Sequence, residues 1–383
     1  MLIAMIVSIS LVVVGKSYPD MFAGFTEIVA SVDFTEVLMG SMLNFLLFAG
    51  AIHISLHDLR KQRIPIMIFS TLGVIISTIV VGTLMYFTFI FLRTHIPFIE
   101  CLVFGALISP TDPIAVIGIL KKAGVRKSLE IKVAGESLFN DGVAVVLFAV
   151  LLQLAQGGDV DITFLHISGL FIQEAGGGLA VGLLLGYIAS HGIKRINSYN
   201  VTVMITLAVV MGGYLITKYL HISGPLTMVA AGLVIGNYGK AMAMSHSDRD
   251  YLDKFWELID EILNAMLFLI IGFELLLIPD LQQYWLIGPI GILIVLLARF
   301  FSIWLPIKFI PKIGTFDGKT ITILVWGGLR GGVSVALALT IDERLHHNLF
   351  LAITYYIVVF SIVAQGLTVG KLVQFQKRTG RVK

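Results

Sequence analysis

The chain is a succession of long apolar runs separated by short polar connections. An apolar run of about 20 residues is long enough for a helix to cross the hydrocarbon core of a bilayer, and the alternating pattern of a transmembrane β-strand is not found in these runs. The pattern predicts an all-α polytopic membrane protein with about twelve spans, at residues 2–18, 35–56, 64–92, 98–120, 132–155, 162–190, 199–219, 222–239, 255–278, 284–310, 319–341 and 347–372.

The composition supports this prediction over the whole chain. Hydrophobic residues make up 57% of the sequence and charged residues only 13%, and the mean hydropathy is +0.94. A soluble domain carries about a quarter charged residues, so residues 1–383 are expected to form a single integral membrane unit with no soluble domain and no affinity for nucleic acid. The lone cysteine, Cys101, rules out an intrachain disulfide.

The distribution of basic residues predicts the orientation. Positively charged residues concentrate in the cytoplasmic connections of membrane proteins. Most of the 27 lysines and arginines lie in the connections that follow even-numbered spans, or in the carboxyl-terminal tail. Both termini are therefore expected to be cytoplasmic. The odd-numbered connections contain only Lys16, Arg93, Lys218 and Arg344.

Two of the spans are expected to be broken near their middle. Span 98–120 contains Ser-Pro-Thr-Asp-Pro at 109–113, and prolines remove backbone donors from a helix. Span 319–341 contains four glycines around Arg330. The two spans are seven apart in order, so they cross in opposite directions. This arrangement predicts inverted-topology repeats whose two discontinuous helices cross near the midplane.

Three charges are expected near this crossing: Asp112, Asp141 and Arg330. A charge inside the bilayer is costly and is kept where it handles ions or protons. Ser137 and Asp141 are four residues apart and so share a helix face. Their oxygens, together with backbone carbonyls freed around Thr111, suit a small alkali cation, and Asp112 can bind it directly or through water.

A buried carboxylate can bind either a proton or a cation, so the two compete for one charge. This competition favours an exchanger, which is a secondary transporter rather than an enzyme and needs no cofactor. An ion channel that conducts without coupling is an alternative. An intramembrane hydrolase with Asp112 and Asp141 as an aspartyl dyad is a weaker one, because it leaves the repeat and Arg330 unexplained.

The remaining intramembrane polar residues are interpreted as structural. Glu136 is expected to pair with Arg330, because an unpaired intramembrane arginine is costly, and Asn140 is expected to support the break. Three further expectations follow from position in the spans: Arg299 pairs with Glu257, Asp260 or Glu261, His53 and His57 lie at the cytoplasmic interface rather than at a metal site, and Glu174 faces either a cavity or a dimer partner.

Four motifs together resemble those of bacterial NhaP-type sodium/proton antiporters, in the wider monovalent cation/proton antiporter family. The resemblance covers residues from about 34 to 373. The motifs are Ser-Pro-Thr-Asp-Pro at 109–113, Gly-Glu-Ser-Leu-Phe-Asn-Asp-Gly at 135–142, Phe-Leu-Ile-Ile-Gly-Phe-Glu at 268–274 and Trp-Gly-Gly-Leu-Arg-Gly-Gly-Val-Ser at 326–334.

The resemblance implies a homodimer in a bacterial or archaeal cell membrane that exchanges Na⁺ for H⁺ by an elevator-like motion. The core part is expected at about 64–190 and 255–372, and the dimerisation part at about 1–56 and 199–239. The resemblance also implies Na⁺ ligation by Asp141, Ser137 and the Thr111 backbone, with Asp112 nearby, and a structural Glu136–Arg330 pair.

Two details of the resemblance concern ion preference and stoichiometry. The Asn140–Asp141 pair resembles that of electroneutral members, which exchange one cation for one proton. Many relatives carry an acid at the position of Ala49, so the preference among Na⁺, Li⁺ and K⁺ stays open, and a K⁺-preferring exchanger is an alternative. Relatives often have thirteen spans, so the first one is expected to be absent here.

Overall fold

A computed structural model describes residue 10 and residues 36–112, 114–122, 124–125, 127–157, 164–196, 198–240, 244, 246–277, 281–313 and 316–378. Within these ranges the regular structure is helical, apart from one isolated antiparallel bridge between Asp112 and Leu329. The predicted all-α class is confirmed. The predicted span 2–18 lies outside the described residues, except for Ser10.

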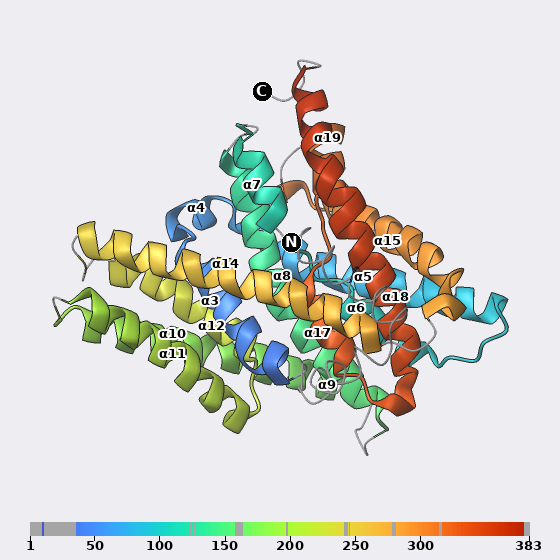
Figure 1. The fold of residues 1–383 in the computed structure, drawn as a ribbon, viewed down its shortest axis with the longest axis horizontal. Helices are drawn as coiled ribbons and strands as arrows, with labels where there is room; N and C mark the ends of the chain where they lie inside the picture. The colour runs from blue at the N-terminus through green and yellow to red at the C-terminus, as the bar shows by residue number, and fades with distance from the viewer. Residues whose placement is uncertain are drawn as a thin grey trace.

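Each of the other predicted spans corresponds to one, two or three helical elements (Figure 1). In chain order these elements are η1 (Glu36–Met42), α3 (Leu43–Ile52), α4 (Leu56–Lys61), α5 (Arg63–Phe91), α6 (Phe98–Leu107), α7 (Ile114–Lys122), α8 (Lys127–Ala155), α9 (Phe164–Phe171), η2 (Ile172–Gly176), α10 (Gly177–Ile193), α11 (Tyr199–Leu220), α12 (Gly224–Val234), η3 (Ile235–Gly239), α14 (His246–Leu277), η4 (Leu281–Tyr284), α15 (Ile287–Phe309), η5 (Pro311–Ile313), α16 (Gly318–Trp326), α17 (Gly332–Leu339), η6 (Glu343–Leu345), α18 (His347–Phe360), η7 (Ser361–Gln365) and α19 (Gly366–Arg378).

Six continuous helical segments in the described part of the chain are long and apolar enough to cross a membrane. The predicted span 255–278 lies in α14, a continuous helix of 32 residues that is too polar to be among the six. The other spans in the described residues are shorter or are interrupted, as the sequence predicts for those with proline or glycine near the middle. The six segments are Arg63–Phe91, Lys127–Ala155, Ser168–Ile193, Tyr199–Leu220, Ile287–Phe309 and His347–Phe375.

The two interrupted spans cross at their breaks. One break separates α6 from α7 and the other separates α16 from α17. The backbone N–H of Asp112 donates to the carbonyl of Leu329 at 2.8 Å, so each break supplies a partner for the other. A Cβ atom at Gly331 would lie 2.7 Å from the Asp112 side chain, which explains why glycine occupies that position. The predicted pair of discontinuous crossing helices is confirmed.

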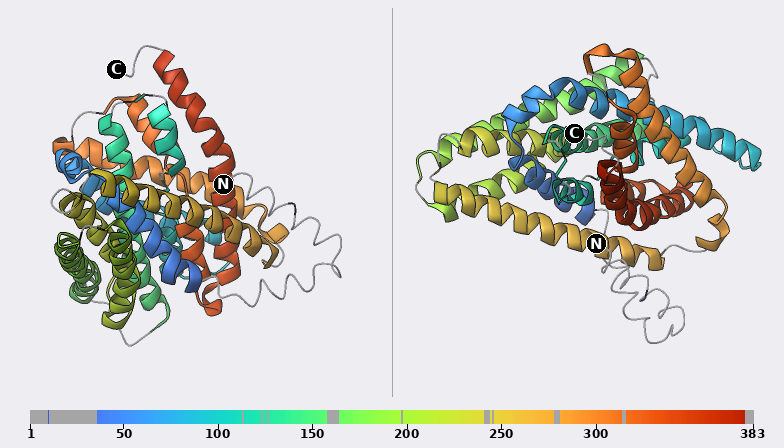
Figure 2. Two further views of the ribbon diagram at one scale, coloured as in Figure 1. Left: turned by 60° about the vertical axis from the view of Figure 1, so that its left-hand side comes forward. Right: turned by 90° about the horizontal axis from the view of Figure 1, so that it is seen from above.

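The helices form two main packing groups (Figures 1 and 2). In one group α3, α10, α11 and α12 pack together, with α12 between α3 and α10. In the other group α5, α6, α15, α17 and α18 surround a second apolar core. Helix α8 contacts both groups, through α5 and α6 on one side and α12 on the other. The polar positions of α8 therefore lie between them.

A charged cluster ties the end of α3 to the start of α14. Lys240 donates to the Asp253 carboxylate and, at 3.0 Å, to the carbonyl of Ile52. His53 Nδ1 lies 3.3 Å from Asp253 Oδ1. Partial burial raises the pKa of the Asp253 carboxyl, but the hydrogen bonds and positive charges of His53 and Lys240 outweigh burial, so its pKa lies below the ordinary value.

This depressed pKa gives the first prediction. A carboxyl whose pKa is lower in the folded than in the unfolded state stabilises the fold above the unfolded value of about 4 and loses this contribution as the pH falls through the folded value. Asp253→Asn should therefore lower the melting temperature of the purified protein more near neutral pH than below about pH 4. An equal difference at both pH values would contradict the linkage.

The close contact of α10 with α12 gives a second prediction. A Cβ atom at Gly182 would lie 2.8 Å from the Ala230 Cβ and 2.9 Å from the Thr227 Cα. Overpacking of this kind costs about 1–3 kcal/mol, so Gly182→Val should lower the melting temperature in detergent. Gly212→Val, on α11, is the matched control, because a Cβ there meets nothing within 4 Å. Equal effects of both substitutions would disprove the packing argument.

Candidate functional site

Helix α8 places three polar side chains against the break between α6 and α7. Ser137 and Asn140 are buried, and Asp141 is only 9% exposed. The Ser137 hydroxyl donates to the Thr111 carbonyl, and Asn140 Nδ2 donates to Thr111 Oγ1 at 2.8 Å. Thr111 thus joins the side chains of α8 to the break, where the sequence places it.

The two acids come from different elements. Asp141 projects from α8, whereas Asp112 lies in the break itself, packed against Gly331 of the other broken helix. The charge of Asp112 repels an ionised Asp141, and that of Arg330 attracts it. Asp141 therefore lies within electrostatic reach of the two other charges that the sequence predicts at this depth.

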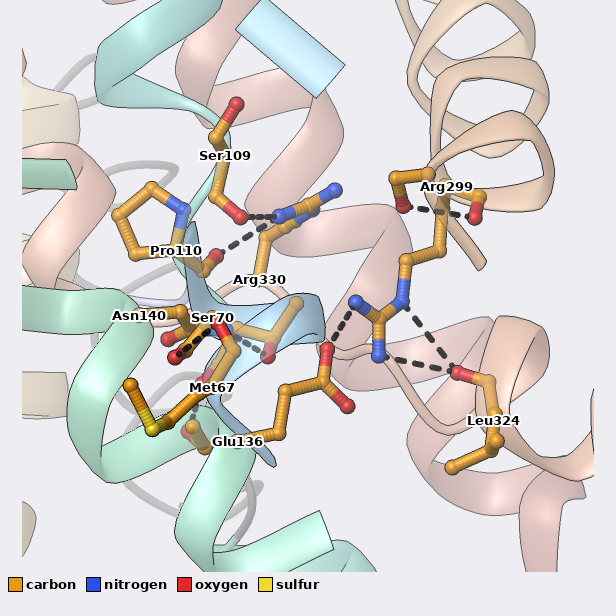
Figure 3. Close-up of polar contacts among 12 residues, drawn as sticks. Met67, Ser70, Ser109, Pro110, Glu136, Asn140, Arg299, Leu324 and Arg330 are labelled. Atoms are coloured by element: carbon orange, nitrogen blue, oxygen red, sulfur yellow. Dashed lines mark hydrogen bonds and ion pairs between the residues drawn. The ribbon is translucent and has the colours of Figure 1, made fainter. Parts of the chain in front are cut away.

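Arg330 differs in its contacts from the prediction. Its Nη1 donates to the carbonyls of Ser109 and Pro110, the latter at 2.9 Å, and no described carboxylate forms an ion pair with it (Figure 3). The break leaves these carbonyls without helical donors, and a guanidinium supplies several donors in one plane. Arg330 therefore holds the first broken helix through its backbone.

The predicted Glu136–Arg330 pair is wrong, because Glu136 pairs with Arg299. Arg299 Nη1 lies 2.5 Å from Glu136 Oε1, and Arg299 also donates to the Leu324 carbonyl from Nε at 3.3 Å and Nη2 at 3.2 Å (Figure 3). The predicted pairing of Arg299 with Glu257, Asp260 or Glu261 is wrong for the same reason.

The packing of α15 explains both corrections. This helix contacts α16, so its buried Arg299 lies at the crossing rather than beside α14. A Cβ atom at Gly328 would lie 2.5 Å from Arg299 Nε, so this glycine makes room for the arginine. The sequence does show that Glu136 has two possible intramembrane partners, Arg299 and Arg330. Only the packing of the helices determines which of them forms the ion pair.

A small cavity lies beside the crossing. Thr111, Asp112, Glu136 and Arg299 contribute to its lining, together with apolar side chains and Gly327. Asp141 is not part of this lining. The Ser137 hydroxyl and the Thr111 carbonyl are in contact at the first break, and Asp141 lies one turn further along α8. Hydroxyl, carbonyl and carboxylate oxygens are the ligands that hard cations prefer.

Two other residues singled out from the sequence lie away from the crossing. Ala49 is fully buried on α3, within the packing group of α12. Glu174 is half-buried on η2, where its backbone carbonyl accepts a hydrogen bond from Ser223 N at 3.2 Å. This position places Glu174 beside the connection between α11 and α12.

Known proteins agree with this fold and these motifs. A family profile described as "Sodium/hydrogen exchanger, transmembrane" matches residues 1–375. The chain is 48% identical over 375 residues to the Na⁺/H⁺ antiporter NhaP of Pseudomonas aeruginosa, covering 95% of this chain and 88% of that protein. It is 34% identical over 348 residues to the Na⁺/H⁺ antiporter NhaH of Halobacillus dabanensis, covering 89% and 83%.

A solved structure supports the architecture independently. The sodium proton antiporter MjNhaP1 from Methanocaldococcus jannaschii at pH 8 superimposes with a TM-score of 0.72 at 19% identity, over 97% of this chain and 98% of that one. With the profile and the relatives, the finding is plain: the chain is a multi-pass membrane protein that belongs to the sodium/hydrogen exchanger family, whose members are secondary transporters.

The corrected ion pair gives a third prediction. Removing one partner of a buried ion pair leaves an uncompensated charge, which costs about 3–5 kcal/mol. Glu136→Gln and Arg299→Met should each lower the unfolding free energy, and the double variant should lose less than the sum of the two. The measurement is a double-mutant cycle on the purified protein.

The same cycle with Arg330→Met in place of Arg299→Met is the control. Its coupling with Glu136→Gln should be clearly smaller, because Arg330 donates to carbonyls rather than to this carboxylate. A larger coupling with Arg330 than with Arg299 would overturn the assignment.

Proposed function

We propose that this protein is a secondary active antiporter that exchanges Na⁺ for H⁺, one for one, by alternating access of a single site. Li⁺ and K⁺ are competing substrates of this site. The alternative is an exchanger that binds K⁺ at the same site in preference to Na⁺. One observation carries the proposal: the buried Asp141 shares a helix face with Ser137, whose hydroxyl meets the Thr111 carbonyl at the break.

The charges around this site support electroneutral exchange. Glu136 and Arg299 neutralise each other as an ion pair, and Arg330 donates to the Ser109 and Pro110 carbonyls. In our proposal Asp141, for which no ion pair is found among the described residues, is the carboxylate whose charge a bound ion neutralises. Either a proton or a monovalent cation can neutralise Asp141, and the binding of one excludes the other. The two loaded forms of the site therefore carry the same charge across the membrane.

The relatives support the choice of cation. Both the Pseudomonas and the Halobacillus proteins are named Na⁺/H⁺ antiporters, and this chain covers more than four fifths of each of them. In our proposal Asp141, Ser137 and the Thr111 carbonyl bind the cation, Asp112 stands beside it, and Asn140 holds the break through Thr111.

We further propose a homodimer in the cell membrane with both termini cytoplasmic. The packing groups support a core part that moves and a dimerisation part that stays, with the bounds expected from the sequence (about 64–190 with 255–372, and 1–56 with 199–239) except at α10. Because α10 packs on α12 at Gly178, Gly182 and Gly186, we place α10 with the dimerisation part. Exposed apolar side chains on α10 and α11 face lipid or a second copy.

The fourth prediction tests the carrier. In proteoliposomes an imposed Na⁺ gradient should move protons, and Asp141→Asn should abolish this movement because the amide can take up neither a proton nor a cation's charge. Asp342→Asn makes the same chemical change in a loop where Asp342 pairs with the exposed Arg344, and it should exchange like the wild type. Exchange by Asp141→Asn at the wild-type rate would sink the mechanism.

The same preparation distinguishes an exchanger from a channel. Electroneutral exchange predicts no current on a solid-supported membrane and no dependence on voltage, whereas a channel conducts without coupling to protons. Competition at Asp141 also predicts that the apparent affinity for Na⁺ falls as the pH is lowered.

A further inference from the structure

A chain of buried hydrogen bonds holds the break of the second broken helix. The π-helical turn η7 supplies it: the Ser361 hydroxyl accepts from the backbone N–H of Arg330 at 2.8 Å and donates to Gln365 Oε1 at 2.7 Å. Gln365 Nε2 then donates to the Trp326 carbonyl at 3.1 Å. Trp326 is the last residue of α16, so one side-chain pair satisfies backbone groups at both edges of the break.

The burial of these groups makes their partners important. Ser361 and Gln365 are almost completely inaccessible, as is Arg330. The last carbonyls of a helix lack intrahelical donors, and an unsatisfied backbone group away from water is costly. The contact with a carbonyl also fixes the orientation of the amide, because only its nitrogen can donate there. Turns of π-helix inside an α-helix often mark functional sites.

The position of this pair repeats that of the proposed cation ligands. The span that follows the first broken helix carries Ser137 and Asp141, four residues apart, and Ser137 contacts the backbone of the first break. The span that follows the second broken helix carries Ser361 and Gln365, also four apart, and Ser361 contacts the backbone of the second break. The second half thus has a neutral amide where the first has the carboxylate.

The contacts of the second break explain what this amide does. Leu329 accepts the hydrogen bond of Asp112, and the next residue, Arg330, holds the Ser109 and Pro110 carbonyls. We propose that Ser361 and Gln365 are positioning residues of the transport site, which hold this segment so that Arg330 and the Asp112–Leu329 bridge keep the first break in its cation-binding geometry. The inference deepens the proposed exchange function and rests on it.

The test uses Gln365→Met, which keeps a similar length but cannot make either hydrogen bond, and Ser361→Ala. A loosened break lowers the fraction of molecules that can bind the cation, and the apparent affinity falls with that fraction. We expect the apparent KM for Na⁺ of each variant to rise about tenfold, as the loss of a buried hydrogen bond implies, with a smaller change in the maximal rate. The two substitutions should not be additive, since they interrupt one chain.

Thr368→Val is the matched control. Thr368 lies one turn further along and accepts from the Trp326 side chain at 2.9 Å, but not from the break. Its KM should stay within about twofold of the wild type, and the control should also show normal melting behaviour in detergent. A KM for Gln365→Met and Ser361→Ala equal to that of Thr368→Val would overturn the inference, and so would fully additive effects.

Hydrogen exchange separates this inference from the proposed function. In purified protein without any ion gradient, the amide of Arg330 should exchange faster in Ser361→Ala than in the wild type or in Thr368→Val. Unchanged exchange at this amide would overturn the positioning role even if the wild type exchanges Na⁺ for H⁺. A wild type that transports neither ion would disprove the proposed function. The hydrogen-exchange result would still decide whether Ser361 holds the backbone of Arg330.

Discussion

The structure depends on one requirement: backbone groups freed at membrane depth must find partners inside the protein. Two helices stop and restart near their middle, and each break exposes donors and acceptors that an unbroken helix would pair. The breaks meet each other through Asp112 and Leu329. Other freed groups find side-chain partners: Arg330 donates to the Ser109 and Pro110 carbonyls, and Ser137 on α8 donates to the Thr111 carbonyl. Ser361 and Gln365 on η7 pair with backbone groups of the second break. The polar side chains within the apolar spans therefore make the breaks possible, because they pair with the backbone groups that the breaks expose.

Charge balance is the second requirement, and it assigns different tasks to similar residues. Two arginines are buried within the described part of the chain: Arg299 neutralises Glu136, whereas Arg330 donates to carbonyls of the first break. Of the acids at the crossing, Glu136 is fixed in an ion pair, whereas no ion pair of Asp141 is found within the described ranges. In the proposed mechanism, Asp141 is therefore the carboxylate at which a proton and a monovalent cation compete.

Much of this could be predicted from the sequence, because membrane length and backbone satisfaction act locally. The helices of the spans in the described residues, the two breaks around Pro110 and Gly331, and the position of Ser137 near the Thr111 backbone follow from residue type and spacing. The partner of Glu136 could not be predicted in this way. It depends on how α15 packs against α16, and no local sequence pattern encodes that packing. Ser361 and Gln365 were also missed as a pair. The sequence repeat points to them, because they follow the second broken helix as Ser137 and Asp141 follow the first. Neither residue is charged, however, so neither stands out in an apolar span.

The bridge between Asp112 and Leu329 uses only main-chain atoms. Any residue except proline can provide the N–H, and any residue can provide the carbonyl, so this one hydrogen bond between the two halves places almost no demand on the side chains of positions 112 and 329. Mutation can therefore alter the chemistry at position 112 while the two halves stay connected. A scaffold of this kind lets related chains diverge in the ion they select without first having to acquire a new architecture.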